Sequence, residues 1–463
     1  MDTIYELVHF AKNLKYEDIP AEDIEGAKLL IMDILAVSTA GTTAEGVKEV
    51  KTLLDEWGGK EESRVLIFDE KLPAYHAGFL NSVLSHARDF DEVQPDAVCH
   101  TGISVIPTVL TMADELGNID GKKLITTIVA AVDVFVRMGF GVAVSGTESG
   151  WIYSALIGHL IAPLAAGLLM DLTEEQLVDA IGISYSQAGG NQQAARDTSL
   201  TKRMQPAYAV RSGIVSAKFA KAGITGAHNI IDGAYSFYHI YIHDRDNKEK
   251  ITEDLGKKFW IHTLSYKPYP VCGQCLSPTT DVEYLMRENN IRFEEITGIE
   301  VGTNQHGYRA CVEPEEVKYN PQRTVDGQFS IPYSVTCMAM RGHVGLADLT
   351  PEAVTDPAIH AWIKNVKAAV DPDVQAEYPR GICPAKTTIH TTRGDFTAQM
   401  FQKGHPTNPF DFEDMKNKFR ECVKLCIYPM NNVEEMLTRV EHMENEENVA
   451  QFITDFNACF DRA

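Results

Sequence analysis

The feature of this 463-residue chain that most constrains its fold is a change in the period of its apolar residues. Over most of the first 265 residues, apolar side chains recur every three or four positions, which places them on one face of an α-helix. The first part of the chain is therefore expected to be helical. The clearest segments are Ile24–Val37, Tyr75–His86, Ile106–Leu116, Leu124–Met138 and Ala207–Ala222.

Signals for helix ends agree with this period. Thr173 and Gln176 have the spacing of a capping box, in which each side chain bonds the other residue's backbone, and the apolar segment Leu177–Ile183 follows. Gly117 and Gly223 come directly after two of the expected helices, where glycine commonly ends a helix. The boundaries therefore support the helical interpretation.

The period changes in the middle of the chain. Apolar and polar residues alternate over Thr297–Gly302 and Thr387–Phe401, as in half-buried strands, and Arg393–Gly394–Asp395 interrupts the second run like a hairpin turn. Helical spacing returns from about Asp411, and the acidic segment Glu434–Glu447 is interpreted as a solvated helical face.

The expected fold is thus mainly α. A large all-helical domain, residues 1–265 plus 405–463, is expected to contain a smaller inserted α+β domain, residues 266–404.

Charge and composition limit the partners. The net charge of −23 argues against nucleic acid and anionic membranes, but a small acid needs only a few local cations in a pocket. The apolar run Trp151–Met170 contains His159 and Pro163 and is interpreted as a buried core helix, not a membrane span. We expect a cytoplasmic protein, because no signal peptide is evident before the first amphipathic helix and the nine cysteines are odd in number.

The densest group of titratable residues is the segment 86–102, HARDFDEVQPDAVCHTG. If Asn81–Phe90 is helical, His86 and Asp89 lie one turn apart, and the carboxylate can orient the imidazole. The following loop is expected to return His100 toward them. Such a group can transfer protons or bind a metal, although charged residues at a helix end are also commonly solvated surface.

Two further segments carry cations. Lys202 and Arg203 come just before the expected helix Ala207–Ala222, where positive charge opposes the helix dipole unless an anion is bound; the alternative is that both point to water. Lys267 follows Tyr266 in a proline-stiffened loop and can serve as a base or a carboxylate anchor, or simply extend to water.

The other motifs of the sequence do not indicate a specific function. Cys272 and Cys275 form a lone CxxC, which suggests redox exchange or half a zinc site, but we interpret the pair as structural or incidental. The sequence contains no GxGxxG after a strand, no GxxxxGK[ST] and no GxSxG. Dinucleotide, nucleoside triphosphate and α/β-hydrolase chemistry therefore lack their usual motifs.

Four motifs in order resemble those of the MmgE/PrpD family, and the resemblance covers nearly the whole chain. They are an HAxDFDD-like segment at 86–91 followed by His100 and Gly102, a TK pair at Thr201–Lys202 with Arg211–Ser212–Gly213, a KPYP segment at Lys267–Pro270, and an FSxPY segment at Phe329–Tyr333. The resemblance implies a homodimer without metal or organic cofactor. It also implies an active site between the domains, lined by Asp89, His100, Lys202, Lys267 and Tyr333.

The chain departs from the family pattern at several positions. Ile152 stands after Gly150–Trp151 where many members have histidine, which weakens a decarboxylase interpretation. Val93 and Gln205 also replace residues that are often polar or histidine. Arg88 replaces an apolar residue, so a substrate with another anionic group facing Arg88 is plausible, and His86 and Arg203 complete the predicted substrate-binding set.

The resemblance therefore implies a cofactor-free lyase acting on a small di- or tricarboxylate. We expect dehydration of a citrate-like hydroxy acid, begun by proton abstraction next to a carboxylate. His100, oriented by Asp89, is expected to transfer the proton, with Tyr333 as hydrogen-bond donor or proton carrier. Lys202 and Lys267 would hold the developing charge. The alternatives are an epimerase of a dicarboxylate such as iminodisuccinate, a decarboxylase of a cis-aconitate-like acid, and a non-catalytic carboxylate-binding relative.

Overall fold

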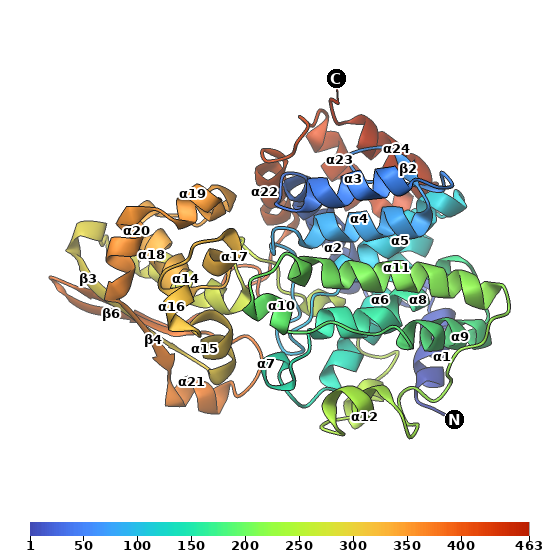
Figure 1. Ribbon diagram of the computed structural model, residues 1–463, viewed down its shortest axis with the longest axis horizontal. Helices are drawn as coiled ribbons and strands as arrows, with labels where there is room; N and C mark the ends of the chain where they lie inside the picture. The colour runs from blue at the N-terminus through green and yellow to red at the C-terminus, as the bar shows by residue number, and fades with distance from the viewer. Residues whose placement is uncertain (463) are drawn as a thin grey trace. The chain divides into compact units, whose positions relative to one another are not determined.

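The computed structural model describes residues 1–462 of the chain (Figure 1). Helices far outnumber strands, so the expected mainly α class is confirmed. The chain divides into two compact units, each of which packs mainly within itself. Unit 1 is Met1–Leu264 together with the segment from Phe410 onward, and unit 2 is Ser265–Pro409.

Within residues 1–462, unit 1 is built from twelve longer helices, and the expected helical segments of the first half all lie in them. A two-stranded antiparallel pair, β1 (Ser63–Arg64) with β2 (Lys71–Leu72), is an addition that the apolar period did not predict, because two residues are too few to show alternation. The longer helices are α1 (Ile4–Asn13), α2 (Ala21–Gly41), α3 (Val47–Trp57), α4 (Ala74–His86), α5 (Gly102–Leu116), α6 (Gly121–Phe140), α8 (Tyr153–Leu169), α9 (Glu174–Tyr185), α11 (Thr201–Lys221), α22 (Phe412–Val423), α23 (Val433–Glu441) and α24 (Val449–Ala458). The shorter helices are α7 (Gly146–Ser149), α10 (Gln193–Arg196), α12 (Phe237–Ile242) and α13 (Glu249–Thr252).

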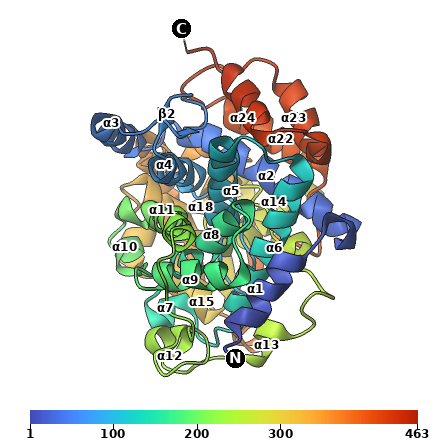
Figure 2. The same ribbon diagram turned by 90° about the vertical axis from the view of Figure 1, so that its right-hand side faces the viewer.

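Helix α8 forms the centre of unit 1. Figure 2 shows it surrounded by α5, α6, α9 and α11, and it packs against all four. Every residue of α8 is buried, which confirms the interpretation of the apolar run as a core helix. Among residues 1–462, no helix has both the length and the apolar character needed to cross a bilayer.

The predicted helix ends are largely confirmed. Thr173 and Gln176 make both hydrogen bonds of a capping box at the start of α9, and Gly117 ends α5 with a φ of +73°. One boundary was wrong: α11 begins at Thr201, before Pro206. Proline lacks an N–H and often marks a helix start, but here the turn begins earlier, because the N–H groups of Lys202 and Arg203 donate to Ser199 and Leu200. Lys202 and Arg203 therefore lie in the first turn of α11.

The C-terminal part of unit 1 follows the expected pattern. Asp411 caps α22, and its carboxylate accepts from the N–H of Asp414. In α23, Glu434 and Glu435 are exposed while Met436, Leu437 and Val440 are buried, so this acidic segment presents a solvated face as predicted.

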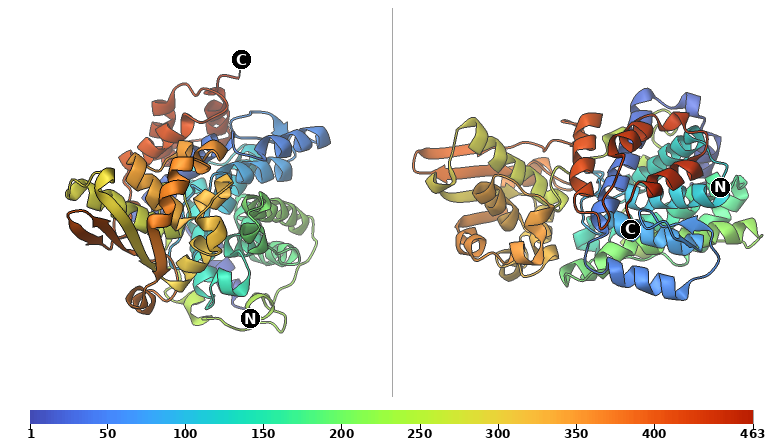
Figure 3. Two further views of the ribbon diagram at one scale, coloured as in Figure 1. Left: turned by 60° about the vertical axis from the view of Figure 1, so that its left-hand side comes forward. Right: turned by 90° about the horizontal axis from the view of Figure 1, so that it is seen from above.

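Unit 2 contains a four-stranded sheet in the order β4-β3-β5-β6. β3 (Ile296–Thr303) pairs parallel with β4 (Val366–Val370) and antiparallel with β5 (Lys386–Thr391), and the hairpin from β5 to β6 (Gly394–Ala398) turns where predicted (Figure 3, where this pair is orange-red). Helices α14 (Gly273–Glu288) and α18 (Ile331–Arg341) pack on the sheet. The remaining helices are α15 (Gln305–Cys311), α16 (Glu315–Lys318), α17 (Thr324–Gln328), α19 (Pro351–Val354), α20 (Pro357–Trp362) and α21 (Pro372–Glu377).

The CxxC pair opens helix α14. Cys272 is its N-cap, and Cys275 is a fully buried member of the core of unit 2. Neither cysteine is part of a disulfide. The buried position of Cys275 favours the structural interpretation of this residue.

Candidate active site

Helix α4 carries the first site histidine at its last position. It was expected to continue to Phe90, but it ends at His86 because Asp89 has a φ of +52°. A right-handed helix cannot pass through this left-handed conformation, which aspartate tolerates better than most residues. His86 Nε2 and Asp89 Oδ1 are still 3.7 Å apart, but the two residues do not share a helix face.

A tight loop brings the second histidine back. The N–H of Gln94 donates to the carbonyl of Cys99, and the Gln94 side chain accepts from the N–H groups of Asp96 and Ala97. The loop between Gln94 and Cys99 thus closes on itself and returns His100 to Asp91. The expectation that this loop returns His100 to the helix end is met.

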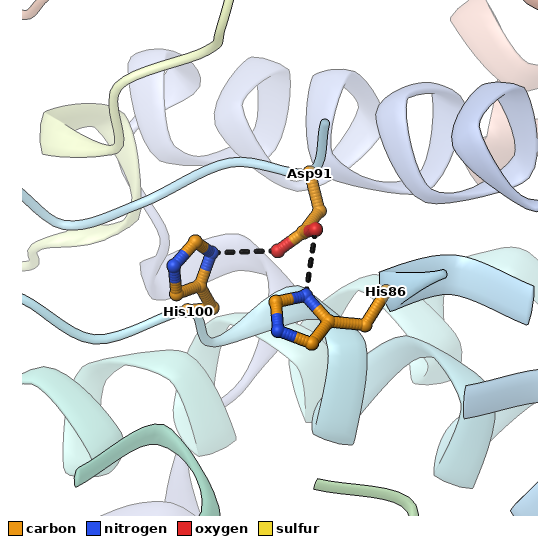
Figure 4. Close-up of side chains that lie close together, drawn as sticks. All are labelled: His86, Asp91 and His100. Carbon is orange, nitrogen blue, oxygen red and sulfur yellow. Dashed lines mark hydrogen bonds and ion pairs between the residues drawn. The ribbon is translucent and has the colours of Figure 1, made fainter. Parts of the chain in front are cut away.

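Asp91 joins the two histidines (Figure 4). Its Oδ1 lies 2.8 Å from His86 Nδ1, and its Oδ2 lies 2.6 Å from His100 Nδ1. The carboxylate that contacts His100 is therefore Asp91, and the prediction that Asp89 would orient His100 was wrong. The left-handed turn at Asp89 directs its side chain elsewhere, and Asp91 takes the place between the rings.

The charge distribution in this group follows from burial and from the two imidazoles. Burial alone would raise the pKa of Asp91, but His86 and His100 together hold the pKa of this carboxyl well below its usual range. Burial lowers the pKa of His86 to about 4, and Lys202 adds to that effect. Asp91 is thus an anion between two rings, and His86 is neutral near pH 7.

The low pKa of His86 predicts acid sensitivity of the fold. Its folded value of about 4 lies below the unfolded value of 6.5, so the unfolded chain binds the proton first and stability falls as the pH drops from about 6.5 to about 4. We expect His86→Gln to remove up to about 3 kcal/mol of this pH dependence, at about 1.4 kcal/mol per pKa unit. Denaturant unfolding at pH 7 and pH 4 measures it. His9→Gln, at an exposed histidine, should leave the difference between the two pH values as in wild type.

Asp89 pairs with Lys202 instead. Lys202 Nζ donates to Asp89 Oδ1 over 2.7 Å and lies 3.0 Å from His86 Nε2. A lysine in the first turn of α11 opposes the helix dipole, and Asp89 supplies the compensating anion from within the protein. Since the ammonium has only donors, His86 Nε2 accepts, and the remaining ring proton is on Nδ1 facing Asp91.

The two arginines predicted to bind substrate differ in their contacts. Arg88 Nε donates to the carbonyl of Ala40 and its Nη2 to Thr43 Oγ1, so its guanidinium stabilises the C-terminal end of α2. Burial and the neighbouring Arg203 lower the pKa of Arg88 to about 10. Arg203 is buried beside the site, and Asp89 partly offsets the effect of that burial on its pKa.

Sequence reasoning missed three charged residues that hold the site in place. Glu92 Oε1 accepts from the N–H groups of Thr101 and Gly102 at 2.6 and 2.7 Å, next to His100. Asp33 of α2 accepts from the N–H of Glu92 and lies 2.7 Å from Lys418 of α22. All three are buried. Glu92 lies in the segment 86–102, the densest group of titratable residues in the sequence, whereas Asp33 and Lys418 had no sequence signal other than their charge.

The two predicted site residues of unit 2 are both fully buried. Lys267 has no exposed surface, so it does not extend to water. The Tyr333 hydroxyl donates to the carbonyls of Asp348 and Ala353 at 2.5 and 3.2 Å, and burial raises its pKa. These main-chain bonds, together with its place in the core of unit 2, favour a packing role for Tyr333 over proton transfer.

His86, Asp91 and His100 are also a possible metal group, and their spacing bears on that alternative. Two ligands of a tetrahedral zinc at about 2.05 Å lie about 3.3 Å apart. The contacts here are 2.6 and 2.8 Å, both shorter than that separation.

We therefore expect turnover to be unchanged after exhaustive dialysis against EDTA. An assay with and without added Zn²⁺ or Mg²⁺ measures this. Activity that disappears on dialysis and returns with a divalent ion would make His86, Asp91 and His100 ligands instead.

Comparisons with known proteins agree with the motifs. The model of the MmgE/PrpD N-terminal domain matches residues 5–250, and that of the C-terminal domain matches residues 269–443. Cis-aconitate decarboxylase of Aspergillus terreus strain NIH 2624 / FGSC A1156 is 27% identical over 346 residues, which cover 71% of this chain and 70% of that enzyme. Cis-aconitate decarboxylase of Mus musculus is 23% identical over 94% of this chain and 89% of its own length. Cis-aconitate decarboxylase-like protein oryM of Aspergillus oryzae is 23% identical over 90% and 89%. With two family models that together span most of its length, this chain belongs to the MmgE/PrpD family.

Proposed function

We propose that this enzyme is a cofactor-free lyase that acts on a small di- or tricarboxylate, and that its reaction is the dehydration of a citrate-like hydroxy acid. The observation that carries the proposal is the contact of Asp91 with His100 Nδ1. A carboxylate this close to Nδ1 favours the tautomer with its proton on Nδ1, so we assign Nε2 as the nitrogen that takes a proton from the substrate. His100 is also the most exposed member of the group, with 18% of its side chain accessible against 2% for His86.

In the proposed reaction, His100 Nε2 removes the proton from a carbon next to a substrate carboxylate. The electron pair of that C–H bond forms the new carbon–carbon double bond, and the hydroxyl on the neighbouring carbon leaves as water after receiving the proton back from the His100 imidazolium. Negative charge builds on the carboxylate during the first step. Lys202 and Arg203 are buried cations close to Asp89, and cations aimed at developing charge in a water-poor site are worth a few kcal/mol.

Decarboxylation is the second candidate, because the relatives described above are named cis-aconitate decarboxylases. Ile152, the residue before α8, argues against decarboxylation. Many members of the family have a histidine at this position, and an aliphatic side chain cannot donate or accept a proton. The same His100 would then protonate the carbon from which carbon dioxide departs. Proton abstraction by His100 is favoured because Asp91 stabilises the imidazolium that the abstraction produces.

A panel of di- and tricarboxylates incubated with the enzyme in deuterium oxide tests the proposal. Formation of an alkene with release of water supports dehydration, and release of carbon dioxide would establish decarboxylation instead. Deuterium exchange with inversion but no net loss of atoms would establish an epimerase. Binding without exchange would establish a non-catalytic relative.

The proposal also covers the domain boundaries and the oligomeric state. We propose that the domains are residues 1–265 with 405–463 and residues 266–404, a division supported by the two compact units. We also propose that the enzyme works as a homodimer, which sedimentation of the purified chain would test.

A further inference from the structure

Unit 1 contains a cavity that adjoins the family motif at Thr201 and Gln205 but is lined by none of the residues to which we assign a step of the reaction. It has a volume of about 680 Å³, which is within the range of small-molecule sites. Its wall is formed partly by α11, whose residues Gln205, Tyr208, Ser212 and Val215 recur at helical spacing on one face. None of the residues that line it belongs to the group of Asp89, Lys202 and the two site histidines.

A second part of the cavity wall is the segment Gly189–Asn191, which is bonded to α11. The side chain of Gln205 holds this segment in place. It accepts from the N–H of Asn191 at 2.6 Å and donates to the carbonyl of the same residue at 3.1 Å. Gly190 has a φ of +129°, and a Cβ there would approach Ala155 Cβ to 2.6 Å. A residue with a side chain would therefore be strained and would clash, so the glycine preserves this wall.

Within the described chain, one polar side chain lining the cavity has a nitrogen without a hydrogen-bond partner, and another is a cation that makes no ion pair. His159 of α8 is only 4% exposed, yet its Nδ1 has no hydrogen-bond partner among residues 1–462. Arg211 of α11 also lines the cavity, and over the described part of the chain it makes no ion pair with a carboxylate. Its guanidinium lies over the ring of Tyr75, 5.9 Å from the centroid.

An arginine without an acidic partner is notable in a chain with 65 acidic and 42 basic residues. A buried polar atom without a hydrogen bond destabilises the protein, so a ligand that supplies the bond is favoured. Burial lowers the pKa of His159 to about 4, so the ring is neutral and offers one N–H and one lone pair. A carboxylate can pair with Arg211 in a bidentate manner and accept from the imidazole N–H.

We propose that this cavity is a second carboxylate site, which binds a small organic acid through Arg211 and His159. It is separate from the group that we assign to the reaction. Two helices connect them. Helix α11 carries Lys202 in its first turn and Arg211 near its middle, and α8 carries both His159 and Ser154, whose hydroxyl accepts from the N–H of His100.

Calorimetric titration of the whole protein with tricarballylate tests the proposal. Wild type is expected to bind one equivalent per chain that Arg211→Gln weakens by about 10- to 100-fold, the effect of losing one charge-assisted hydrogen bond. Arg196→Gln removes the same charge from an exposed arginine of α10 outside the cavity and should leave binding unchanged. Val215→Phe, which reduces the cavity volume without touching a charge, should also abolish this equivalent.

Circular dichroism and thermal unfolding check that each variant is folded. If Arg211→Gln does not fold, Val215→Phe still tests the proposal. Equal affinity and stoichiometry in wild type, Arg211→Gln and Val215→Phe would overturn the proposal. So would a loss of dimer in the two cavity variants with tricarballylate binding unchanged, which would assign the cavity to a second copy of the chain. The result is independent of turnover, because binding at the reaction group would appear as a separate equivalent that Arg211→Gln does not affect.

Discussion

Asp91→Asn is expected to reduce turnover by about 1,000- to 10,000-fold while the protein remains folded. Asp91 contacts the Nδ1 atoms of both His86 and His100, at 2.8 and 2.6 Å. Asparagine offers one carbonyl oxygen and one NH₂ group in place of two acceptor oxygens. One imidazole must therefore move its proton to Nε2, and in His100 that change removes the lone pair which takes the substrate proton.

Initial rates of wild type and Asp91→Asn across a pH range measure this effect. Asp96→Asn is the matched control, because it makes the same change at an exposed position of the same loop and should retain turnover. The double variant Asp91→Asn with His100→Ala should be hardly slower than the slower single variant, because the two residues act as one unit. Additive losses, or more than about a tenth of wild-type turnover in Asp91→Asn, would remove this pair from the mechanism.

The fold could be predicted where the sequence pattern is local. Helix α8 and the capping box of α9 follow from apolar runs and cap residues that are adjacent in the chain. The hairpin of β5 and β6 follows from alternation interrupted by a turn. The end of α4 could not be predicted in the same way, because Asp89 leaves the helix through a single backbone angle of +52°.

The candidate site was predicted as a group of residues but not as a set of contacts. Asp89 and Asp91 are two positions apart, and the apolar period does not show which of them faces His100. The contact of Lys418 with the site segment is even harder to predict from the sequence. Its ammonium donates to the carbonyl of Phe90, 328 positions earlier in the chain. Such a contact depends on the packing of α22 against α2, and no local pattern encodes it.

The pairing of Lys202 with Asp89 leads to a prediction that separates stability from catalysis. The two side chains are 10% and 3% exposed and their charged atoms are 2.7 Å apart. Lys202→Met removes the ammonium and leaves Asp89 as a buried charge that has lost this partner. The free energy of unfolding is expected to fall by about 3–5 kcal/mol, the usual cost of breaking a buried pair from one side.

Removing both charges should restore the fold but not the reaction. In Asp89→Asn with Lys202→Met, the buried anion is gone, so most of the lost stability should return, since replacing both members of a buried pair is often close to neutral. Turnover should remain low if Lys202 stabilises the charge that develops on the substrate carboxylate. Lys221→Met, at the exposed other end of α11, should change neither property by a large amount.

Urea unfolding and initial rates on the same preparations measure both quantities. A double variant that is both stable and active would show that Lys202 serves only to neutralise Asp89, and the cation for the substrate would then have to come from Arg203 or Lys267. A single variant Lys202→Met with wild-type stability would show that the buried pair contributes nothing to the fold. Stability that recovers without turnover removes the structural explanation for the loss, and it assigns the lysine to the chemistry where Asp89→Asn alone retains more turnover than the double variant.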